Sequence, residues 1–269
     1  MVLGYDEPRP TRKNYDSFLE RLVAGLEKLN NPEICLMLYG SYVREDFVPG
    51  RSDIDGVLIF PRDVIIGKSV MRYLSKTIAN AQRGNNVPIQ ITPTDLRTMS
   101  DGRFNSYEEN FKNYFKEEGK IIFGHDYRDR FRFEPPSISE QTPLRFNLRK
   151  SRIGLLHSEY DKEKNYGKFL ENLNKAMNAA SRGSKQILFL MDGKLRKNRF
   201  SALDEIRNIF PQVDTKPLKR IKDIYDNPRK LDGVYKSPIQ ATRLFYNSVT
   251  FFEEMIKAYL DANPRSQER

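Results

Sequence analysis

Two aspartates that alternate with apolar residues constrain the fold of this chain more than any other feature. Asp53 and Asp55 flank Ile54 at the start of an apolar run. Side chains along a β-strand point to opposite faces in turn, so the two carboxylates are expected on one face, about 6 to 7 Å apart. Ile54, Val57 and Ile59 are expected to serve the other face. Like charges this close repel unless a cation lies between them, and such oxygen ligands suit Mg²⁺.

A Gly-Ser pair precedes the aspartates and ends an earlier apolar run over residues 33–39. Gly40 allows the backbone to approach a phosphate closely, and the amides of the following turn, with the Ser41 hydroxyl, can donate to phosphate oxygens. Arg44 follows one turn later and could add a charged contact, and Ser52 directly precedes Asp53. The two segments together predict a site for a metal ion and a phosphorylated ligand.

At these residues the chain resembles the nucleotidyltransferase superfamily that includes DNA polymerase beta and the aminoglycoside nucleotidyltransferases. The signature is Gly-Ser, a loop, then Asp-hydrophobic-Asp on the next strand, and it is matched here by Gly40, Ser41, Ser52, Asp53, Ile54 and Asp55. One departure is Glu45, where small relatives commonly have Gly.

The resemblance implies a metal-dependent enzyme that moves a nucleoside monophosphate from a nucleoside triphosphate, such as ATP, to a hydroxyl acceptor and releases pyrophosphate. Asp53 and Asp55 would be catalytic and would hold one or two Mg²⁺ or Mn²⁺ ions. The residues that would bind the nucleotide are Gly40, Ser41, Arg44 and Ser52. The acceptor could be RNA or tRNA, a protein or a small molecule, and an antibiotic adenylyltransferase of the aminoglycoside type is an alternative.

The general base is not evident from the sequence. In the resembled families a third carboxylate often lies on the next strand, but Gln90 stands at the best-aligned position of the strand expected over residues 87–92. Asp95 and Glu159 are alternative sources of a carboxylate, although Asp95 also fits a helix cap and Glu159 a solvated helix end. If Gln90 indicates that the transfer reaction has been lost, the chain is instead a catalytically silent module that binds nucleotide or nucleic acid.

Hydrophobic periodicity predicts an α+β chain with two domains. A nucleotidyltransferase domain over 1–124 would hold a mixed sheet flanked by helices, a proline-rich linker would span 125–143, and an all-α bundle would occupy 144–269. In the first domain we expect helices from residue 11 or 14 to 29, from an Asp63 cap to 82, and over 104–118, and strands over 33–39, 53–60, 87–92 and 119–124. In the bundle we expect helices over 144–163, 166–192, 200–209, 215–225 and 239–262.

The order of the two domains resembles kanamycin nucleotidyltransferase and the related HEPN helical domains. Arg152 and His157 have the spacing of the Arg-x4-His ribonuclease signature of some HEPN domains, but Ile153 stands where a polar residue is usual. A helical bundle that cleaves RNA is therefore a third hypothesis for the function.

Basic charge is concentrated in the second half of the chain. Residues 1–140 hold 20 Lys and Arg against 21 Asp and Glu, whereas residues 141–269 hold 26 against 15, which accounts for the net charge of +10. Such a surface favours polyanions such as RNA and counts against a polycationic antibiotic. The basic run Lys194–Arg199 could hold a triphosphate or an RNA backbone. The sequence leaves open whether the bundle forms a homodimer.

We expect neither a membrane span nor a signal peptide in this sequence. No window approaches the roughly 18 apolar residues of a membrane span, and the first residues do not form a signal peptide. Cys35 is the single cysteine, which excludes internal disulfides. We interpret it as a small buried apolar residue. We therefore expect a cytoplasmic protein with no membrane partner.

Overall fold

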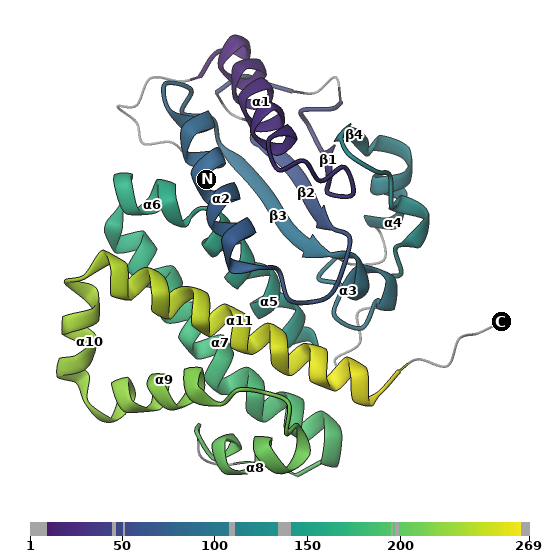
Figure 1. Ribbon diagram of the computed structural model, residues 1–269. Coiled ribbons are helices and arrows are strands. Elements are labelled where there is room, and N and C mark those ends of the chain that lie inside the picture. The colour runs from purple at the N-terminus through teal and green to yellow at the C-terminus, as the bar shows by residue number, and fades with distance from the viewer. Residues whose placement is uncertain are drawn as a thin grey trace.

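The computed structural model describes residues 10–44, 47–50, 52–107, 111–133, 141–194, 196 and 199–264. Within these ranges, a four-stranded mixed sheet has the order β3-β2-β1-β4. Its strands are β1 (Cys35–Tyr39), β2 (Ile54–Phe60), β3 (Ile89–Asp95) and β4 (Lys120–Phe123). β1 pairs antiparallel with both β2 and β4, and β2 pairs parallel with β3. A mixed sheet followed by a helical region confirms the predicted α+β class (Figure 1).

The third strand is longer than expected. β3 pairs with β2 from Ile54 opposite Ile89 to Phe60 opposite Asp95, and Pro93 lies inside it. Proline lacks the N–H that a central strand needs, but β3 is an edge of the described sheet, where that donor is not required.

The assignment of residues to the two faces of β2 was partly wrong. Ile54 and Leu58 share the face covered by α1 (Arg12–Glu27) and α2 (Lys68–Gln82), as Figure 1 shows. Val57 and Ile59 instead pack on the opposite face with residues of β1 that include Cys35. Because residues two apart share a face, Val57 and Ile59 lie on the side of Asp55. Burial raises the pKa of the Cys35 thiol to about 12, as fits a buried apolar side chain.

Asp63 does not cap α2, so that prediction was wrong. The helix begins at Lys68, and the Asp63 carboxylate accepts a hydrogen bond from the amide of Val64 and pairs with Arg97 at 3.1 Å and Lys257 at 3.6 Å. These partners come from distant elements, which the local sequence does not reveal.

The predicted helix over 104–118 was partly wrong, because the described residues are helical only from residue 111 onward. α3 (Leu96–Asp101) ends before this segment, which holds α4 (Phe111–Asn113) and a π-helical turn (Tyr114–Glu118), and a 3-10 turn follows at Arg128–Arg130. The Asn105 side chain donates to the carbonyl of Arg132 and accepts from the amide of Tyr107. These hydrogen bonds hold Asn105 outside any helix.

The C-terminal half of the described chain is helical (Figure 1). Its helices are α5 (Gln141–Leu156), α6 (Ser158–Lys164), α7 (Tyr166–Asp192), α8 (Ala202–Ile209), α9 (Lys216–Asp226), α10 (Pro228–Tyr235) and α11 (Pro238–Ala262). The single helix expected over 144–163 breaks at His157, and α10 was not expected.

One cluster of buried apolar residues runs from α1 and the sheet into α7 and α11. The sheet and the helical region therefore share a core, and the division into domains at 124 and 143 stays a prediction.

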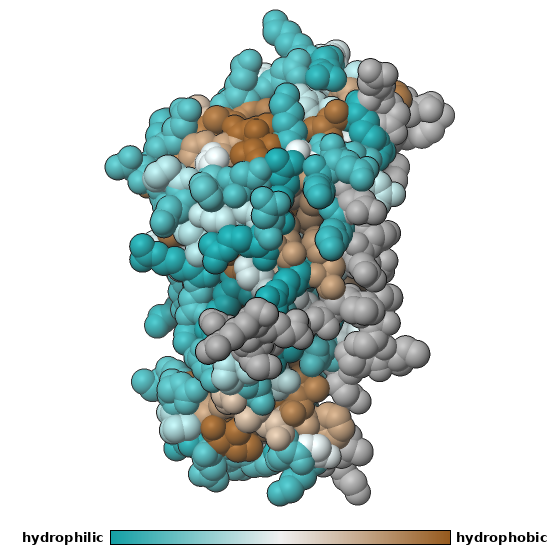
Figure 2. All heavy atoms as spheres, turned by 90° about the vertical axis from the view of Figure 1, so that its right-hand side faces the viewer, coloured by the Kyte–Doolittle hydropathy of each residue, from teal (hydrophilic) through white to brown (hydrophobic). Residues whose placement is uncertain are grey.

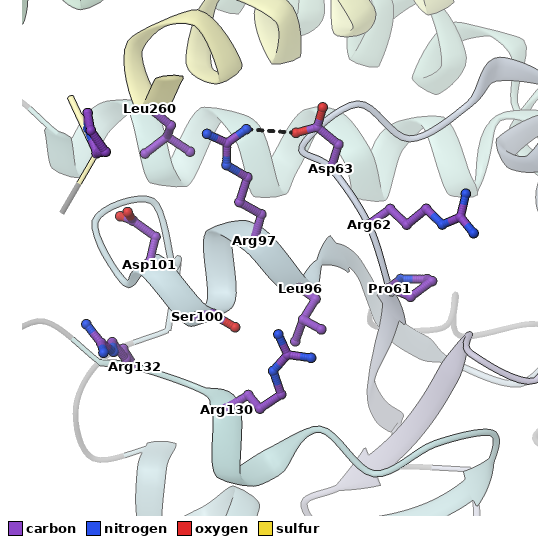
Figure 3. A pocket seen from close by; sticks show the side chains of 11 residues that line it. Pro61, Arg62, Asp63, Leu96, Arg97, Ser100, Asp101, Arg130, Arg132 and Leu260 are labelled. Atoms are coloured by element: carbon purple, nitrogen blue, oxygen red, sulfur yellow. Dashed lines mark hydrogen bonds and ion pairs between the residues drawn. The ribbon is translucent and has the colours of Figure 1, made fainter. Parts of the chain in front are cut away.

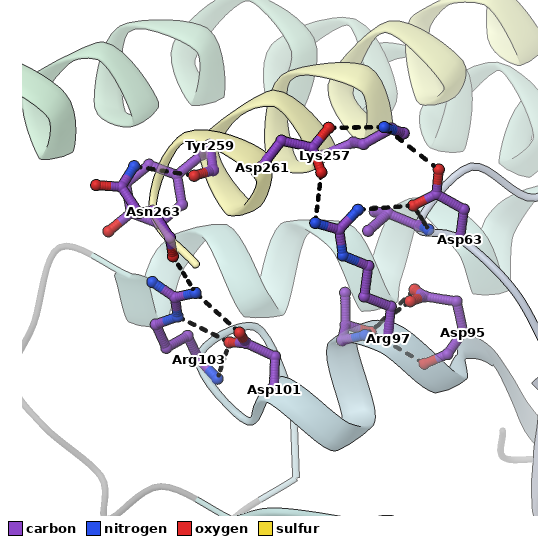
Figure 4. Close-up of polar contacts among 11 residues, drawn as sticks. Asp63, Asp95, Arg97, Asp101, Arg103, Lys257, Tyr259, Asp261 and Asn263 are labelled. Carbon is purple, nitrogen blue, oxygen red and sulfur yellow. Dashed lines mark hydrogen bonds and ion pairs between the residues drawn. The ribbon is translucent and has the colours of Figure 1, made fainter. Parts of the chain in front are cut away.

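Ion pairs join α11 to the end of the sheet. Figure 4 shows Arg97 of α3 between Asp63 and Asp261, with Lys257 bridging the same two carboxylates. Deeper in the same interface, Arg152 of α5 is buried and contacts carboxylates of β3 and α11.

Hydrophilic side chains cover most of the molecular face in Figure 2, and hydrophobic ones gather there in small separate patches. Among the described helices, none is both long enough and apolar enough to cross a membrane.

Candidate active site

The candidate site begins with a row of three residues across the sheet. Asp55 of β2 lies opposite Tyr39 of β1 and opposite Gln90 of β3. Asp53 directly precedes β2, two residues before Asp55. The alternation seen in the sequence therefore places both aspartates at the start of β2, and Gln90 occupies the neighbouring position that was inferred from the resemblance.

Gly40 lies directly against the Asp55 carboxylate. Its φ of 76° is in the left-handed region, and a Cβ added to it would lie 2.7 Å from Asp55 Oδ2. Glycine is thus required for two reasons, the backbone conformation and the close approach to the carboxylate.

The two aspartates are electrostatically coupled. Burial raises the pKa of Asp55 to about 6, and the charge of Asp53 adds to this effect. The positive charges of Arg149 and Arg44 act in the opposite direction without cancelling it. The pair therefore retains excess negative charge, which a divalent cation would neutralise.

The turn after Gly40 contains two internal hydrogen bonds and leaves the Ser41 hydroxyl available as a donor. The amides of Val43 and Arg44 donate to the carbonyl of Gly40 at 3.2 and 3.3 Å. The Ser41 hydroxyl makes no hydrogen bond to any other described residue. Arg44 pairs with Glu118 at 3.1 Å, so its guanidinium is held beside this turn.

Ser52 lies in the loop that leads into β2. Its hydroxyl accepts from the amide of Val48 at 3.0 Å, and its carbonyl accepts from the Tyr15 hydroxyl at 2.7 Å. The Tyr15 hydroxyl also accepts from the amide of Gly50. Ser52 thus shapes the loop that positions Asp53.

A comparison with family models matches residues 19–153 to the nucleotidyltransferase domain family. The match spans half of the chain and includes the Gly40 turn, both aspartates and Gln90. The chain belongs to this family.

Among solved structures, the spectinomycin adenyltransferase AAD(9) from Enterococcus faecialis, solved with ATP and spectinomycin, is similar over 92% of this chain and 99% of its own, with 12% identity and a TM-score of 0.31. No protein in the curated set matches the chain.

The sequence did not single out Arg149 of this nucleotidyltransferase. α5 packs against β3 and brings Arg149 close enough to lower the pKa of Asp55. The Arg149 guanidinium lies over the Tyr107 ring, 4.5 Å from its centroid. No local pattern could have found this residue, because its role depends on where α5 packs.

Neither alternative general base lies free beside Gln90. Asp95 is buried, caps α3 by accepting from the amide of Thr98, and pairs with Arg152 at 2.9 Å. Glu159 pairs with Lys162 at 2.8 Å, and its amide donates to the hydroxyl of Ser75 on α2. The cap interpretation of Asp95 is confirmed, and the solvated helix end expected for Glu159 is a packed contact between α6 and α2.

Arg152 and His157 do not form a shared site. Arg152 points into the interior, where it contacts Asp95, Glu253 at 2.7 Å and the carbonyl of Val64. His157 lines a separate pocket with Gln90. The ribonuclease hypothesis requires both side chains in one site, and this arrangement does not support it. The HEPN-like assignment of the bundle stays a prediction.

Two arginines of the basic run Lys194–Arg199 make contacts within the described chain. Arg196 is buried between Asp192 at 2.7 Å and Glu205. Arg199 lies over the Tyr225 ring, 4.5 Å from its centroid. Leu195, Lys197 and Asn198 of this run, like Glu45, lie outside the described residues.

A second cavity of about 610 Å³ lies at the other ends of β2 and β3. Figure 3 shows Arg97, Arg130 and Ser100 around it, with Arg97 held by Asp63. Since Asp53 and Asp55 stand at the start of β2 and this cavity follows its end, the cavity does not belong to the candidate active site.

Proposed function

We propose that this nucleotidyltransferase moves a nucleoside monophosphate from a nucleoside triphosphate, ATP being the first to test, to a hydroxyl acceptor and releases pyrophosphate. The observation that carries the proposal is the contact between Gly40 and the carboxylate of Asp55, with Asp53 two residues away. This contact brings the turn after Gly40, which we propose binds phosphate, next to the paired carboxylates.

The residues present fit a divalent cation. Two coupled carboxylates retain excess negative charge, and the described residues contain no group of three or more His, Cys, Asp and Glu that would enclose a metal. Mg²⁺ suits such a donor set, because it commonly takes one or two carboxylates and completes its shell with water and phosphate. When bound, the ion would polarise the α-phosphate and offset charge on the leaving pyrophosphate.

The protein's own groups would position the triphosphate. Ser41 and the amides at the start of the turn after Gly40 would donate to phosphate oxygens, and Arg44 would add a positive charge held by Glu118. Ser52 would act indirectly, by fixing the loop before Asp53.

The reaction forms a bond between the acceptor oxygen and the α-phosphorus and breaks the bond from that phosphorus to the oxygen of the β-phosphate. Gln90 is a neutral amide and cannot take the hydroxyl proton. Gln90 is also exposed, so water can reach this side of the site and accept the proton.

Calorimetry of ATP binding tests the metal and the two aspartates together. We expect binding with Mg²⁺ or Mn²⁺, and at least tenfold weaker binding in excess chelator or in Asp53→Asn with Asp55→Asn. Asp226→Asn, which alters an exposed carboxylate on α9, should bind ATP as the wild type does. Equal affinity with and without chelator would contradict the metal site.

Transfer itself is tested with triphosphates radiolabelled at the α-phosphate, offered with total RNA, protein and small hydroxyl compounds. We expect label in one acceptor class together with release of pyrophosphate, and no transfer by the double Asn variant. Triphosphate binding without transfer to any acceptor would favour the catalytically silent alternative.

A further inference from the structure

A pocket of about 440 Å³ opens beside the candidate active site, and we call it the basic pocket. It lies between the edge strand β3 and helices α5, α6 and α7. The residues of the basic pocket that carry the argument are Gln90, Phe146, Lys150, His157, Lys168 and Lys175. Because Gln90 lies opposite Asp55 in the sheet register, the pocket adjoins the paired carboxylates on the side away from the Gly40 turn.

The charged groups of the basic pocket are mostly cationic. Arg149, Lys150, Lys168 and Lys175 line it, against the single carboxylate of Asp161. Lys168 lies 3.6 Å from Asp161, and Lys175 pairs with Glu171 outside the pocket. Within the described part of the chain, Arg149 and Lys150 have no carboxylate within ion-pair distance, and both lie over aromatic rings. The pocket therefore favours an anion.

An exposed aromatic ring adds a stacking surface. Phe146 is 54% exposed and lines the pocket, and the Lys150 ammonium lies 4.1 Å from its ring centroid. An exposed ring beside cations is the arrangement with which proteins hold a nucleobase and its phosphate.

A buried hydrogen-bonding atom in the pocket lacks a partner. His157 is 7% exposed, and its Nε2 makes no hydrogen bond within the described structure. Burial lowers the pKa of His157 to about 4, so the imidazole is neutral at physiological pH. A buried polar atom without a partner is costly, and a ligand group would satisfy it.

We propose that the basic pocket receives the acceptor, and that the acceptor is a nucleotide unit carrying phosphate. Its base stacks on Phe146, its phosphate contacts Lys150 and Lys168, and its ribose hydroxyl points past Gln90 toward Asp55. That hydroxyl oxygen forms the bond to the α-phosphorus, its proton passes to water, and pyrophosphate leaves. The proposal rests on the proposed function. It disfavours a dicationic aminocyclitol, which the pocket's cations would repel.

Binding is measured first without triphosphate and in excess chelator, so that it does not depend on transfer. The probes are adenosine 5′-monophosphate, a hexanucleotide RNA with a free 3′-hydroxyl, and spectinomycin as a cation. The mononucleotide and the RNA separate a free nucleotide acceptor from the end of a chain. We expect one or both nucleotide probes to bind and spectinomycin not to compete.

Two variants and two controls test the pocket. Phe146→Ala should weaken nucleotide binding by about five- to a hundredfold, and Phe146→Tyr should restore it. Lys150→Ser should reduce the log–log salt slope of RNA binding by about 0.7. Lys219→Ser on α9, outside the pocket, should leave both quantities unchanged.

The outcomes separate the two proposals. If Phe146→Ala and Lys150→Ser bind both nucleotide probes as the wild type does, the basic pocket is not the acceptor site. If they instead weaken binding of Mg²⁺-ATP without weakening either probe, the pocket holds the donor, and the inference is overturned. If they weaken probe binding but no label reaches a nucleotide, the nucleotide site stands and the proposed transfer fails.

Discussion

Gly40 is the residue on which the geometry of the site depends most. Gly40→Ala adds a Cβ at a φ of 76° and 2.7 Å from Asp55 Oδ2, so the carboxylate must move. The backbone strain should cost about 1–3 kcal/mol of the free energy of unfolding, and ATP binding should be lost as well. Urea unfolding and calorimetry measure the two effects.

Gly193→Ala is a matched control for this prediction. Gly193 has a φ of 67°, but an added Cβ would meet nothing within 4 Å. The control should lose similar stability and retain full ATP binding. If both variants bind ATP normally, the contact between Gly40 and Asp55 has no functional role.

Asp53 is expected to destabilise the metal-free fold at neutral pH. Burial and the charge of Asp53 raise the pKa of Asp55 from 3.8 to about 6. Since the folded-state pKa exceeds the unfolded one, stability is highest when Asp55 is protonated and falls as the pH rises through the folded pKa.

Asp53→Asn should therefore raise the free energy of unfolding in chelator by about 1 kcal/mol at neutral pH. The gain should disappear below the ordinary pKa of an aspartate, where Asp55 is protonated in both states. Urea unfolding at the two pH values measures it. A destabilised variant would show that Asp53 has a structural role.

At the scale of elements, Arg152 connects three segments that are distant in sequence. From α5 it contacts Asp95 at the end of β3, Glu253 of α11 and the carbonyl of Val64. Arg152→Ala leaves two buried carboxylates without their partner, and should cost about 3–5 kcal/mol. Arg220→Ala, which removes an exposed pair on α9, should cost no more than about 1 kcal/mol. Equal costs in urea unfolding would contradict the assigned role of Arg152.

The same contact predicts a dependence of stability on pH. Burial outweighs the opposing charge of Arg152 and raises the pKa of Glu253 from 4.5 to about 7. The unfolded chain loses this proton first, so the contribution of Glu253 to stability declines as the pH rises between these two values. Glu253→Gln should flatten that part of the stability profile, and an unchanged profile would argue against the raised pKa.

At the scale of the whole molecule, basic residues of the second half divide between ion pairs within the fold and the basic pocket. Arg196 is buried between Asp192 and Glu205, whereas Lys150 and Lys168 line the basic pocket beside Gln90. Arg196→Ser should lower the free energy of unfolding, because two carboxylates lose a charged partner. It should leave the salt slope of RNA binding unchanged. A flattened salt slope with unchanged stability would instead indicate that RNA binds at the Lys194–Arg199 run.

The sequence by itself determined the family and the core of the candidate site. Gly40, Asp53 and Asp55 lie within 16 residues of one another, and the alternation along β2 fixes which side chains share a face. The position of Gln90 followed from the resemblance to the family, together with the strand expected over residues 87–92. Such patterns are local, so they can be read without knowing how elements pack.

Only the tertiary structure decided the surroundings of that core. Phe146 and Arg149 come beside β3 because α5 packs against that strand, and Arg152 turns inward because Glu253 of α11 meets it there. Asp63 and Asn105 lie outside helices because their partners come from other elements. These contacts join residues that are far apart in sequence, and their free energy depends on burial and distance in the folded chain. Helical or strand periodicity indicates which face of an element is buried, but not which distant residues that face contacts.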